Sequence, residues 1–552
     1  MHVLLITPPL TQLNTPYPAT AYLKGYYVAQ GHEVRQVDLG IEVADRVLSR
    51  EFLQGIGLEE HARLIEPVKR FLRGRDDTLG PRIANRSLLP EGKRFEQLDE
   101  DNLEWSFGVS GTTDKAQHLA TLFIEDVADY IRENIDPHFD LVRYAEYLSN
   151  DAPSFDPLYD ELQREPSVVD RLMLEILQER LSAFRFPLST IDKVCLTVPF
   201  PGCLYGALRC GQWLKAHTAA QVEVGGGFPN TEWRQLREPR LYEFCDTVAI
   251  DGHPEALDHC PDFSDLPLDR YLSLTEMTNP MHRLWSQGRW NKMVMAQGCY
   301  WHRCAFCDTS LPYIGDYRAP KASTVVDRME RIVEQTGRTG FHFVDEALPP
   351  KLLREVAEEI LRRGLMVSFW GNIRFEKAYS AELCNLLAEA GMVAVSGGLE
   401  VASDRLLKLM DKGVTIRQTV EACRHLRDAG IMVHTYLMYG FPTETLQETV
   451  DALETVRCMF DEGIVQSAFW HRYAMTCHSP SGRNPEAYGA RRVTDEPHPF
   501  CNNEVDWMPQ SDYDIDAVGA ALRLATYNYM NGLGLDQPVR SWFPIRVPKP
   551  SI

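Results

Sequence analysis

The stretch Cys299-Tyr300-Trp301-His302-Arg303-Cys304-Ala305-Phe306-Cys307 gathers three of the chain's thirteen cysteines into one short segment. It follows closely on Met293–Ala296, an apolar run that predicts a buried strand. Three thiolates at this spacing can converge on one metal centre. A tetrahedral zinc site or a cubane iron–sulfur cluster needs four ligands. The sequence therefore predicts a metal centre on Cys299, Cys304 and Cys307, with a fourth position that is open or filled from elsewhere.

Two interpretations of this centre stay open on the residues alone. Cys₃His zinc sites are common, and His302 would supply the fourth ligand of a structural zinc ion. An open catalytic cluster is favoured by location, because the cysteines follow the first strand of a predicted βα series, and such barrels carry their chemistry at the carboxyl ends of their strands. Most other cysteines stand singly in apolar contexts, which is typical of reduced thiols in a reducing compartment.

The βα series continues beyond the cysteines with amphipathic helical segments between its strands. Six strands alternating with helices predict a parallel, barrel-like sheet. The predicted strands are 293–296, 340–344, 366–370, 393–397, 433–438 and 466–470.

Polar side chains and glycines follow the later strands, at the end where a barrel binds its ligands. Arg374 follows the third strand, Gly397, Gly398 and Glu400 end the fourth, and Gly440 follows the fifth. A guanidinium suits a carboxylate, and glycines let a ligand approach the backbone. Taken singly, each residue is equally explained by an inter-strand salt bridge or a tight packing point.

The amino-terminal part shows a second α/β pattern. Strands are predicted at 3–6, 33–38, 193–198, 222–224 and 247–250, with helices at 21–30 and 202–216. Between the second and third strands, a charged amphipathic stretch over about 42–190 predicts a helical insertion. Together these elements indicate an open α/β sheet, which binds ligands beyond the carboxyl ends of its strands. The candidate contacts there are Pro8, Gly202, Gly225, Gly226 and Gly227.

Four parts follow from this pattern. Residues 1–255 are predicted to form a Rossmann-like domain that contains the insertion, and 256–290 to form a linker. Residues 291–475 are predicted to form a partial (β/α)₆ barrel, and 476–552 a small carboxy-terminal domain. The fold class is therefore α/β.

Composition narrows the partners. The 552 residues carry 57 Lys+Arg and 78 Asp+Glu, a formal net charge of −21, and 44% are hydrophobic. This composition is that of a globular protein, and its acidity argues against binding to nucleic acid or anionic membranes. The amino terminus lacks a basic leader, and no apolar run is long enough to span a bilayer. We therefore expect a cytoplasmic protein that acts on a small molecule or a peptide.

The cysteine segment and the strand ends resemble the radical S-adenosylmethionine (SAM) superfamily. Members hold a [4Fe-4S] cluster on three cysteines after the first barrel strand, usually with an aromatic residue before the last cysteine, as Phe306 is here. The resemblance implies that this cluster cleaves SAM to a 5′-deoxyadenosyl radical, and that Arg374, Gly397, Gly398, Glu400 and Gly440 contact SAM. The usual spacing is three residues and then two, whereas this chain has four and then two.

The amino-terminal part resembles the cobalamin-binding domain that precedes the barrel in the B12-dependent branch of this superfamily. The resemblance implies cobalamin as a cofactor, although the Asp-x-His-x-x-Gly motif of proteins that supply an axial histidine is missing after the first strand. A purely structural Rossmann-like domain is the alternative, since a fold does not determine its ligand. His253 is expected to be a loop histidine.

Three functions are compatible with these features. The first is a cobalamin-dependent radical SAM methyltransferase acting on an unactivated carbon and served by a reductant such as flavodoxin or ferredoxin, with Tyr436 near the reacting atoms and Tyr300, Trp301 and His302 as further substrate contacts. The second is a radical SAM cyclase, rearranging enzyme or epimerase without methyl transfer, for which Cys477 or Cys501 would donate hydrogen. The third is a zinc-stabilised, non-catalytic binding protein.

Overall fold

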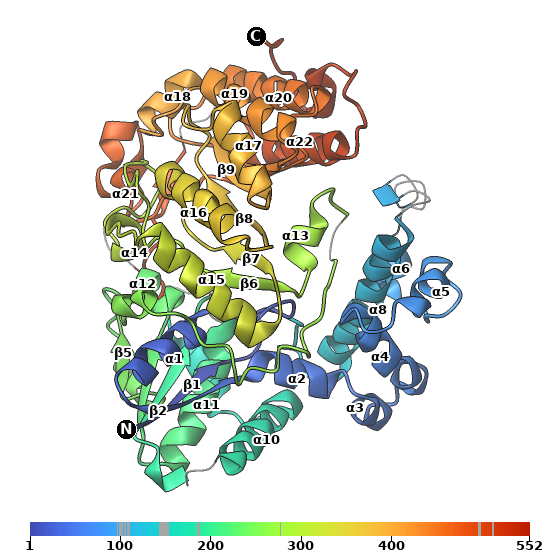
Figure 1. The fold of residues 1–552 in the computed structure, drawn as a ribbon, viewed down its shortest axis with the longest axis vertical. Coiled ribbons are helices and arrows are strands. Elements are labelled where there is room, and N and C mark those ends of the chain that lie inside the picture. Colours follow the sequence, from blue (N-terminus) through green and yellow to red (C-terminus); the bar gives the residue numbers. More distant parts are fainter. Residues whose placement is uncertain are drawn as a thin grey trace.

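The computed structural model describes residues 1–96, 111–142, 154–184, 188–275, 278–494, 498–509 and 513–552, together with 98, 103, 106 and 107. Parts of the predicted insertion (42–190), linker (256–290) and carboxy-terminal domain (476–552) therefore lie outside the described residues. Two parallel sheets organise the chain, which confirms the predicted α/β class (Figure 1).

The first sheet has five parallel strands in the order β2-β1-β3-β4-β5. They are β1 (His2–Thr7), β2 (Glu33–Asp38), β3 (Lys193–Thr197), β4 (Gln221–Gly225) and β5 (Thr247–Ala249). Helices α1 (Ala19–Ala29) and α11 (Leu204–His217) accompany this sheet. Strand β1 has β2 on one side and β3 on the other, so the strand order changes direction at β1. Such a switch point opens a ligand crevice beyond the strand ends.

The stretch between β2 and β3 is helical in its described residues. Its longer helices are α2 (Leu39–Val47), α4 (Glu59–Leu72), α8 (Thr112–Asn134), α9 (Asp156–Gln163) and α10 (Val168–Ala183), with the shorter α3 (Arg50–Gly55), α5 (Gly80–Ala84) and α6 (Lys93–Glu96). Helices α3 to α8 project to one side of the two sheets, at the right of Figure 1. Their apolar faces and the first sheet share one core.

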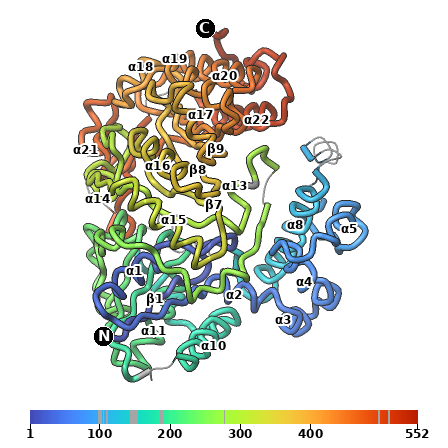
Figure 2. The backbone as a smooth tube through the Cα atoms, viewed as in Figure 1, coloured from blue at the N-terminus to red at the C-terminus, as the bar shows by residue number. Residues whose placement is uncertain are grey.

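The second sheet has six parallel strands in sequential order and ends at β6 on one side and β11 on the other. They are β6 (Trp290–Met293), β7 (Gly340–Phe343), β8 (Ser368–Ile373), β9 (Met392–Glu400), β10 (Met432–Tyr439) and β11 (Ser467–Arg472). The connecting helices are α15 (Ala322–Thr336), α16 (Pro350–Arg363), α17 (Ala381–Glu389), α18 (Asp404–Leu409), α19 (Ile416–Asp428) and α20 (Leu446–Asp461). Helix α22 (Ile515–Met530) packs beside β11, and the chain ends at the far end of this half, away from the amino terminus (Figure 2).

The first barrel strand begins and ends earlier than predicted. It covers Trp290–Met293 rather than 293–296. The next backbone N–H groups donate to side chains instead of a neighbouring strand: Val294 to the Tyr22 hydroxyl, and Met295 and Ala296 to the Asp345 carboxylate, at 2.6–2.8 Å. An apolar run thus continues beyond the ladder because its donors find other buried acceptors.

Candidate functional site

The cysteine loop leaves the end of β6 and is held by a short segment that follows it. Gln297 pairs in antiparallel fashion with Arg318, and the Cys299 N–H donates to the Ile314 carbonyl at 2.9 Å. Gly298 has φ +73°, and a Cβ there would lie 2.7 Å from the Asp316 carbonyl oxygen. Only glycine fits this turn without strain.

All three cysteines of the loop line one cavity of about 270 Å³, here called the cysteine cavity. Ten residues singled out from the sequence meet there: Cys299, His302, Cys304, Phe306, Cys307, Arg374, Gly397, Gly398, Glu400 and Tyr436. Glu346, Asn372, Ser396 and Lys412 complete its polar lining. The ends of β7 to β10 therefore converge on the cysteine loop, as the barrel pattern predicts.

The donor set suits an iron–sulfur cluster. Within the described ranges, no three His, Cys, Asp or Glu side chains come together closely enough to hold one metal ion. His302 lines the same cavity, and its Nδ1 lies 2.9 Å from the Cys299 carbonyl oxygen. Three soft thiolates spread around a cavity suit an iron–sulfur cluster, whose irons are bridged by sulfide.

Positive charge surrounds the thiols. A hydrogen bond from Cys307, helped by the nearby Lys412 and Arg374 cations, lowers the pKa of Cys304 to about 6 despite its burial. The Arg374 Nη1 lies 3.8 Å from the Cys304 sulfur. The thiolate of Cys304, the form that binds metal, is thus stabilised, whereas the hydrogen bond to Cys304 raises the pKa of Cys307.

Glu400 and Lys412 form a buried ion pair in the wall of the cysteine cavity, and each side chain is only 9% exposed. Glu400 has φ +58°, a conformation that few non-glycine residues adopt. Glu400 thus has an ion-pair partner, although Lys412 lies in the turn after α18 and not on a neighbouring strand. The pair also places the Glu400 carboxylate at the cavity wall.

Trp301 wedges the cysteine loop against Arg374. The centre of its ring lies 4.5 Å from the Arg374 guanidinium, and its indole N–H donates to the Asp411 carbonyl at 2.7 Å. The ring fills the space over Gly413, where a Cβ would lie 2.2 Å from it. Trp301 therefore contacts protein rather than the cavity, and so does Tyr300, whose hydroxyl donates to Glu376.

One side of the Arg374 guanidinium is hydrogen-bonded to the backbone, and the other side has an N–H that the described residues leave unsatisfied. Its Nη2 donates to the Lys412 carbonyl, whereas its Nε is buried with no hydrogen-bond partner in the described part of the chain. A buried guanidinium N–H without an acceptor is costly. A carboxylate bound in the cavity would supply that acceptor.

The glycines around this site differ in their surroundings. A Cβ at Gly397 would clash with the Phe375 ring, and one at Gly398 with the Glu400 carboxylate, so close packing alone accounts for both. Gly440 lies outside the cavity lining. Its N–H donates to the Glu444 carboxylate at 2.7 Å and so is already satisfied by the loop after β10.

A second cavity of about 420 Å³, here called the sheet-edge cavity, lies between the carboxyl edge of the first sheet and the barrel. Gly225, Gly226 and Gly227 line it, whereas Pro8 and Gly202 do not. The Pro8-Pro9 turn is covered instead by α11, where Gly206 packs closely against the Pro9 carbonyl.

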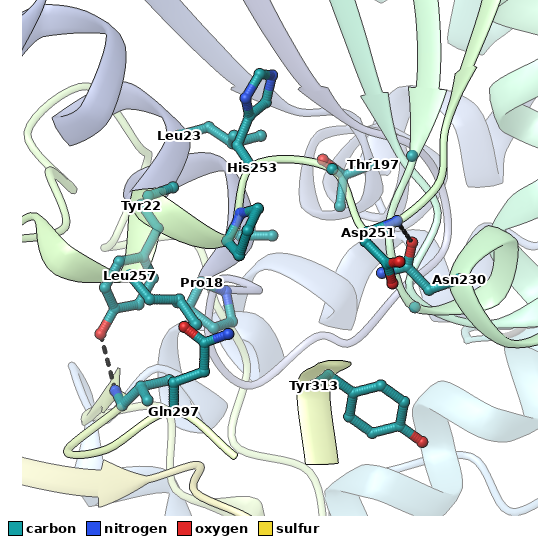
Figure 3. Close-up of a pocket in the computed structure, with 18 of the residues that line it drawn as sticks. Pro18, Tyr22, Leu23, Thr197, Asn230, Asp251, His253, Leu257, Gln297 and Tyr313 are labelled. Carbon is teal, nitrogen blue, oxygen red and sulfur yellow. Dashed lines mark hydrogen bonds between the residues drawn. The ribbon is translucent and has the colours of Figure 1, made fainter. Parts of the chain in front are cut away.

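Figure 3 shows how several elements frame the sheet-edge cavity. Tyr22 and Leu257 stand on one side, Asp251 and Asn230 on the other, and Tyr313 reaches in from the barrel half. Gly226 has φ +118°, and a Cβ there would lie 2.5 Å from the Val198 carbonyl oxygen.

Open space lies beside Gly252, where a Cβ would meet nothing within 4 Å. His253 lies in a loop, as expected; it is partly exposed, lines this cavity and lies 3.0 Å from the Tyr27 hydroxyl.

Residues 293–456 match the Radical SAM superfamily. The chain carries a radical SAM domain. Such a domain implies a [4Fe-4S] cluster and SAM as cofactors, and the cysteine cavity offers three thiolates for the first and an open guanidinium for the second.

Relatives of the radical SAM domain have more than one reaction. The chain is 34% identical over 172 residues to the anaerobic magnesium-protoporphyrin IX monomethyl ester cyclase of Cereibacter sphaeroides, covering 30% of this chain and 27% of that protein. It is 28% identical over 165 residues to the bacteriochlorophyllide d C-12(1)-methyltransferase of Chlorobaculum tepidum, covering 28% and 36%. The chain thus spans less than two fifths of the length of these relatives.

Among solved structures, the chain is similar to the radical SAM methyltransferase TsrM of Kitasatospora setae, solved with cobalamin and a [4Fe-4S] cluster. The TM-score is 0.48 and the identity 15%, over 96% of this chain and 90% of that one. Among the described helices, none has both the length and the apolar character that a bilayer span requires.

The carboxy-terminal tail ties the radical SAM domain to the first sheet. Asn503 donates its backbone N–H to Glu232 of α12 (Gly227–Glu232) at 2.9 Å, and its side-chain amide to Asp308 at 3.1 Å. Asp308 directly follows Cys307. Cys477 and Cys501, the hydrogen donors considered for an epimerase, line neither cavity.

Two functional residues were missed from the sequence: Lys412 and Lys292. Lys412 lies in a turn after α18, and nothing local marks it as the partner of Glu400. Glu346 lines both cavities. Its pKa is raised mainly by burial and also by repulsion from Asp308. The sequence predicts that Lys292 lies just before the first barrel strand, whereas it lies within β6.

Proposed function

We propose that this chain is a radical SAM enzyme that uses cobalamin as a methyl carrier to methylate an unactivated carbon. The observation that carries the proposal is the adjacency of the two cavities: Glu346 lines both, so a cluster site and a large ligand cavity share one wall. A substrate bound there would face both cofactors.

The chain's own residues would divide the work. Cys299, Cys304 and Cys307 would ligate the cluster. Arg374 would take the SAM carboxylate through its open Nε, with Glu400 held toward the ribose or amine by Lys412. Gly225, Gly226 and Gly227 would let a corrin approach the sheet edge. When bound, the cluster and SAM would supply a carbon-centred radical and cobalamin a methyl group, since such cofactors carry the difficult chemistry.

The protein would contribute orientation and exclusion of water. Tyr436 stands at the cysteine cavity with its pKa raised by burial, so its phenol stays neutral and can donate a hydrogen bond to a substrate. A reductant such as flavodoxin or ferredoxin would supply the electron. The proposal includes domain limits at residues 255, 290 and 475. The first sheet would then bind cobalamin, and the second sheet would bind the cluster.

A second candidate is ring formation or another radical rearrangement without methyl transfer. The observation in its favour is the 34% identity to a cyclase. The sheet-edge cavity would then bind cobalamin in another role, or bind substrate alone.

The deciding experiment is anaerobic purification with reconstituted iron and sulfide, followed by iron, sulfide and corrinoid quantification on one sample. About four irons and one corrinoid per chain support the proposal. A product heavier by one methylene then favours methyl transfer, and a product that has lost hydrogen or kept its mass favours the second candidate. Zinc in place of iron would overturn both.

A further inference from the structure

Lys292 places a charged group inside the sheet-edge cavity. It lies on β6 and lines the cavity together with Val294 of the same segment and Val344 beyond β7. Its Nζ donates to the side-chain carbonyl of Gln12 at 2.8 Å, from the loop after β1. The lysine therefore links the barrel to the loop after β1, within the lining of the sheet-edge cavity.

Lys292 is partly buried and lacks a counter-ion among the described residues, unlike the three buried lysines. Lys24 pairs with Asp262 and Asp265, Lys69 with Asp45 and Glu66, and Lys412 with Glu400. Gln12 is neutral, and burial without compensation from any acid lowers the pKa of Lys292 to about 8.

The acids of the same cavity are engaged elsewhere. The Asp345 carboxylate accepts two backbone N–H groups, Glu223 pairs with Lys193, and Asp251 pairs with Arg234. Glu346 lies in the cavity wall, but burial and Asp308, rather than a lysine, determine its pKa. Among the described residues, therefore, no carboxylate of this cavity forms an ion pair with Lys292.

We propose that Lys292 recognises an anionic group, a carboxylate or a phosphate, of a ligand that binds in the sheet-edge cavity. An ammonium buried without a counter-ion destabilises the free protein, and an anion that enters with the ligand removes this cost. The inference rests on the proposed function in taking this cavity as the place where substrate and corrinoid meet.

The same chemistry has two sources. One is an acidic group of the substrate, and the other is the phosphodiester in the nucleotide loop of cobalamin. Cobinamide lacks that loop, so it separates the two. Hexanoate and hexanamide have the same chain and differ in charge, so they report whether the site prefers an anion.

The test compares wild type with Lys292→Met, with Lys292→Arg as a charge-preserving variant and Lys351→Met on the exposed surface of α16 as the control. Each full-length chain is reconstituted anaerobically. Affinities for cyanocobalamin and dicyanocobinamide are measured by equilibrium dialysis, and thermal unfolding midpoints are measured with hexanoate or hexanamide.

An acidic substrate predicts that hexanoate raises the midpoint more than hexanamide in wild type and Lys292→Arg, that this difference disappears in Lys292→Met, and that both corrinoids bind Lys292→Met as before. A nucleotide-loop contact predicts at least tenfold weaker cobalamin binding by Lys292→Met, with cobinamide unaffected. If neither the anion preference nor the cobalamin-to-cobinamide ratio depends on Lys292, the inference is wrong. Wild type that binds neither corrinoid but still prefers hexanoate through Lys292 would remove the cobalamin proposal and leave the anion site.

Discussion

Each of the two cavities has one lysine in its lining, and the surroundings of the two lysines differ in charge. In the cysteine cavity, the attraction of Glu400 and Cys304 outweighs burial and raises the pKa of Lys412. In the sheet-edge cavity, burial acts alone and lowers the pKa of Lys292. The first cavity balances its own charges before any ligand arrives, as a fixed cluster site requires. The second becomes balanced only when an anion binds.

The largest expected effect is the loss of the cluster in Cys304→Ala. Removing one of three thiolates leaves two ligands, and iron should fall from about four per chain to below one, with no cleavage of SAM. Iron analysis and the yield of 5′-deoxyadenosine measure this. Cys458→Ala, on the partly exposed face of α20, is the control and should keep its iron. A Cys304→Ala chain that still cleaves SAM would contradict the ligand assignment.

Replacing each lysine by methionine tests the contrast directly. Lys412→Met leaves Glu400 buried without a partner, and breaking a buried pair in this way costs about 3–5 kcal/mol of unfolding free energy. Lys292→Met removes an uncompensated charge and should be neutral or stabilising. Denaturant unfolding of the two variants measures both. Equal losses in the two would show that the cavities do not differ in charge balance.

The pH dependence of Lys292 has a definite sign. Its pKa is about 8 in the folded chain, below the usual 10.5, so the unfolded chain binds this proton more tightly. The cost of burying the charge is complete below pH 8 and disappears as the pH rises toward 10.5. Wild type should therefore gain about 2–3 kcal/mol relative to Lys292→Met between pH 8 and 10.5. A constant difference across this range would place a counter-ion beside Lys292.

The smallest expected effect concerns the wedge over Arg374. Gly413→Ala puts a methyl group into the Trp301 ring, whereas Gly430→Ala has a similar positive φ and open space around it. The clash should cost about 1–2 kcal/mol beyond the control. It should also weaken SAM binding several-fold, because Trp301 orients the guanidinium. Binding followed by the electron paramagnetic resonance spectrum of the reduced cluster measures this, and unchanged SAM affinity would make Trp301 a packing residue only.

Much of the fold could be predicted because it rests on local patterns. Strand β2 matches its predicted limits, and most other strands differ by a residue or two at their ends. The main error, at β6, arose because the donors of Val294, Met295 and Ala296 go to the side chains of Tyr22 and Asp345, which are distant in the chain. Periodicity carries no information about such partners.

The candidate site shows the same division. Strand-end residues such as Arg374 and Glu400 were found because parallel strands bring their carboxyl ends to one edge. Lys412 and Lys292 were missed because their importance lies in which charges surround them after folding. Gly440 was singled out by its position after a predicted strand. Its N–H, however, donates to the carboxylate of Glu444, four residues further along the chain.

Asn503 connects the two halves of the molecule by hydrogen bonds on one side. Its two hydrogen bonds join α12, which follows the glycine-rich edge, to Asp308, the neighbour of Cys307. Any hinge-like opening that separated these two points would have to break at least one of the two bonds. Asn503 is therefore a cross-link between the two sites, and its loss would leave α12 and Asp308 without this shared partner.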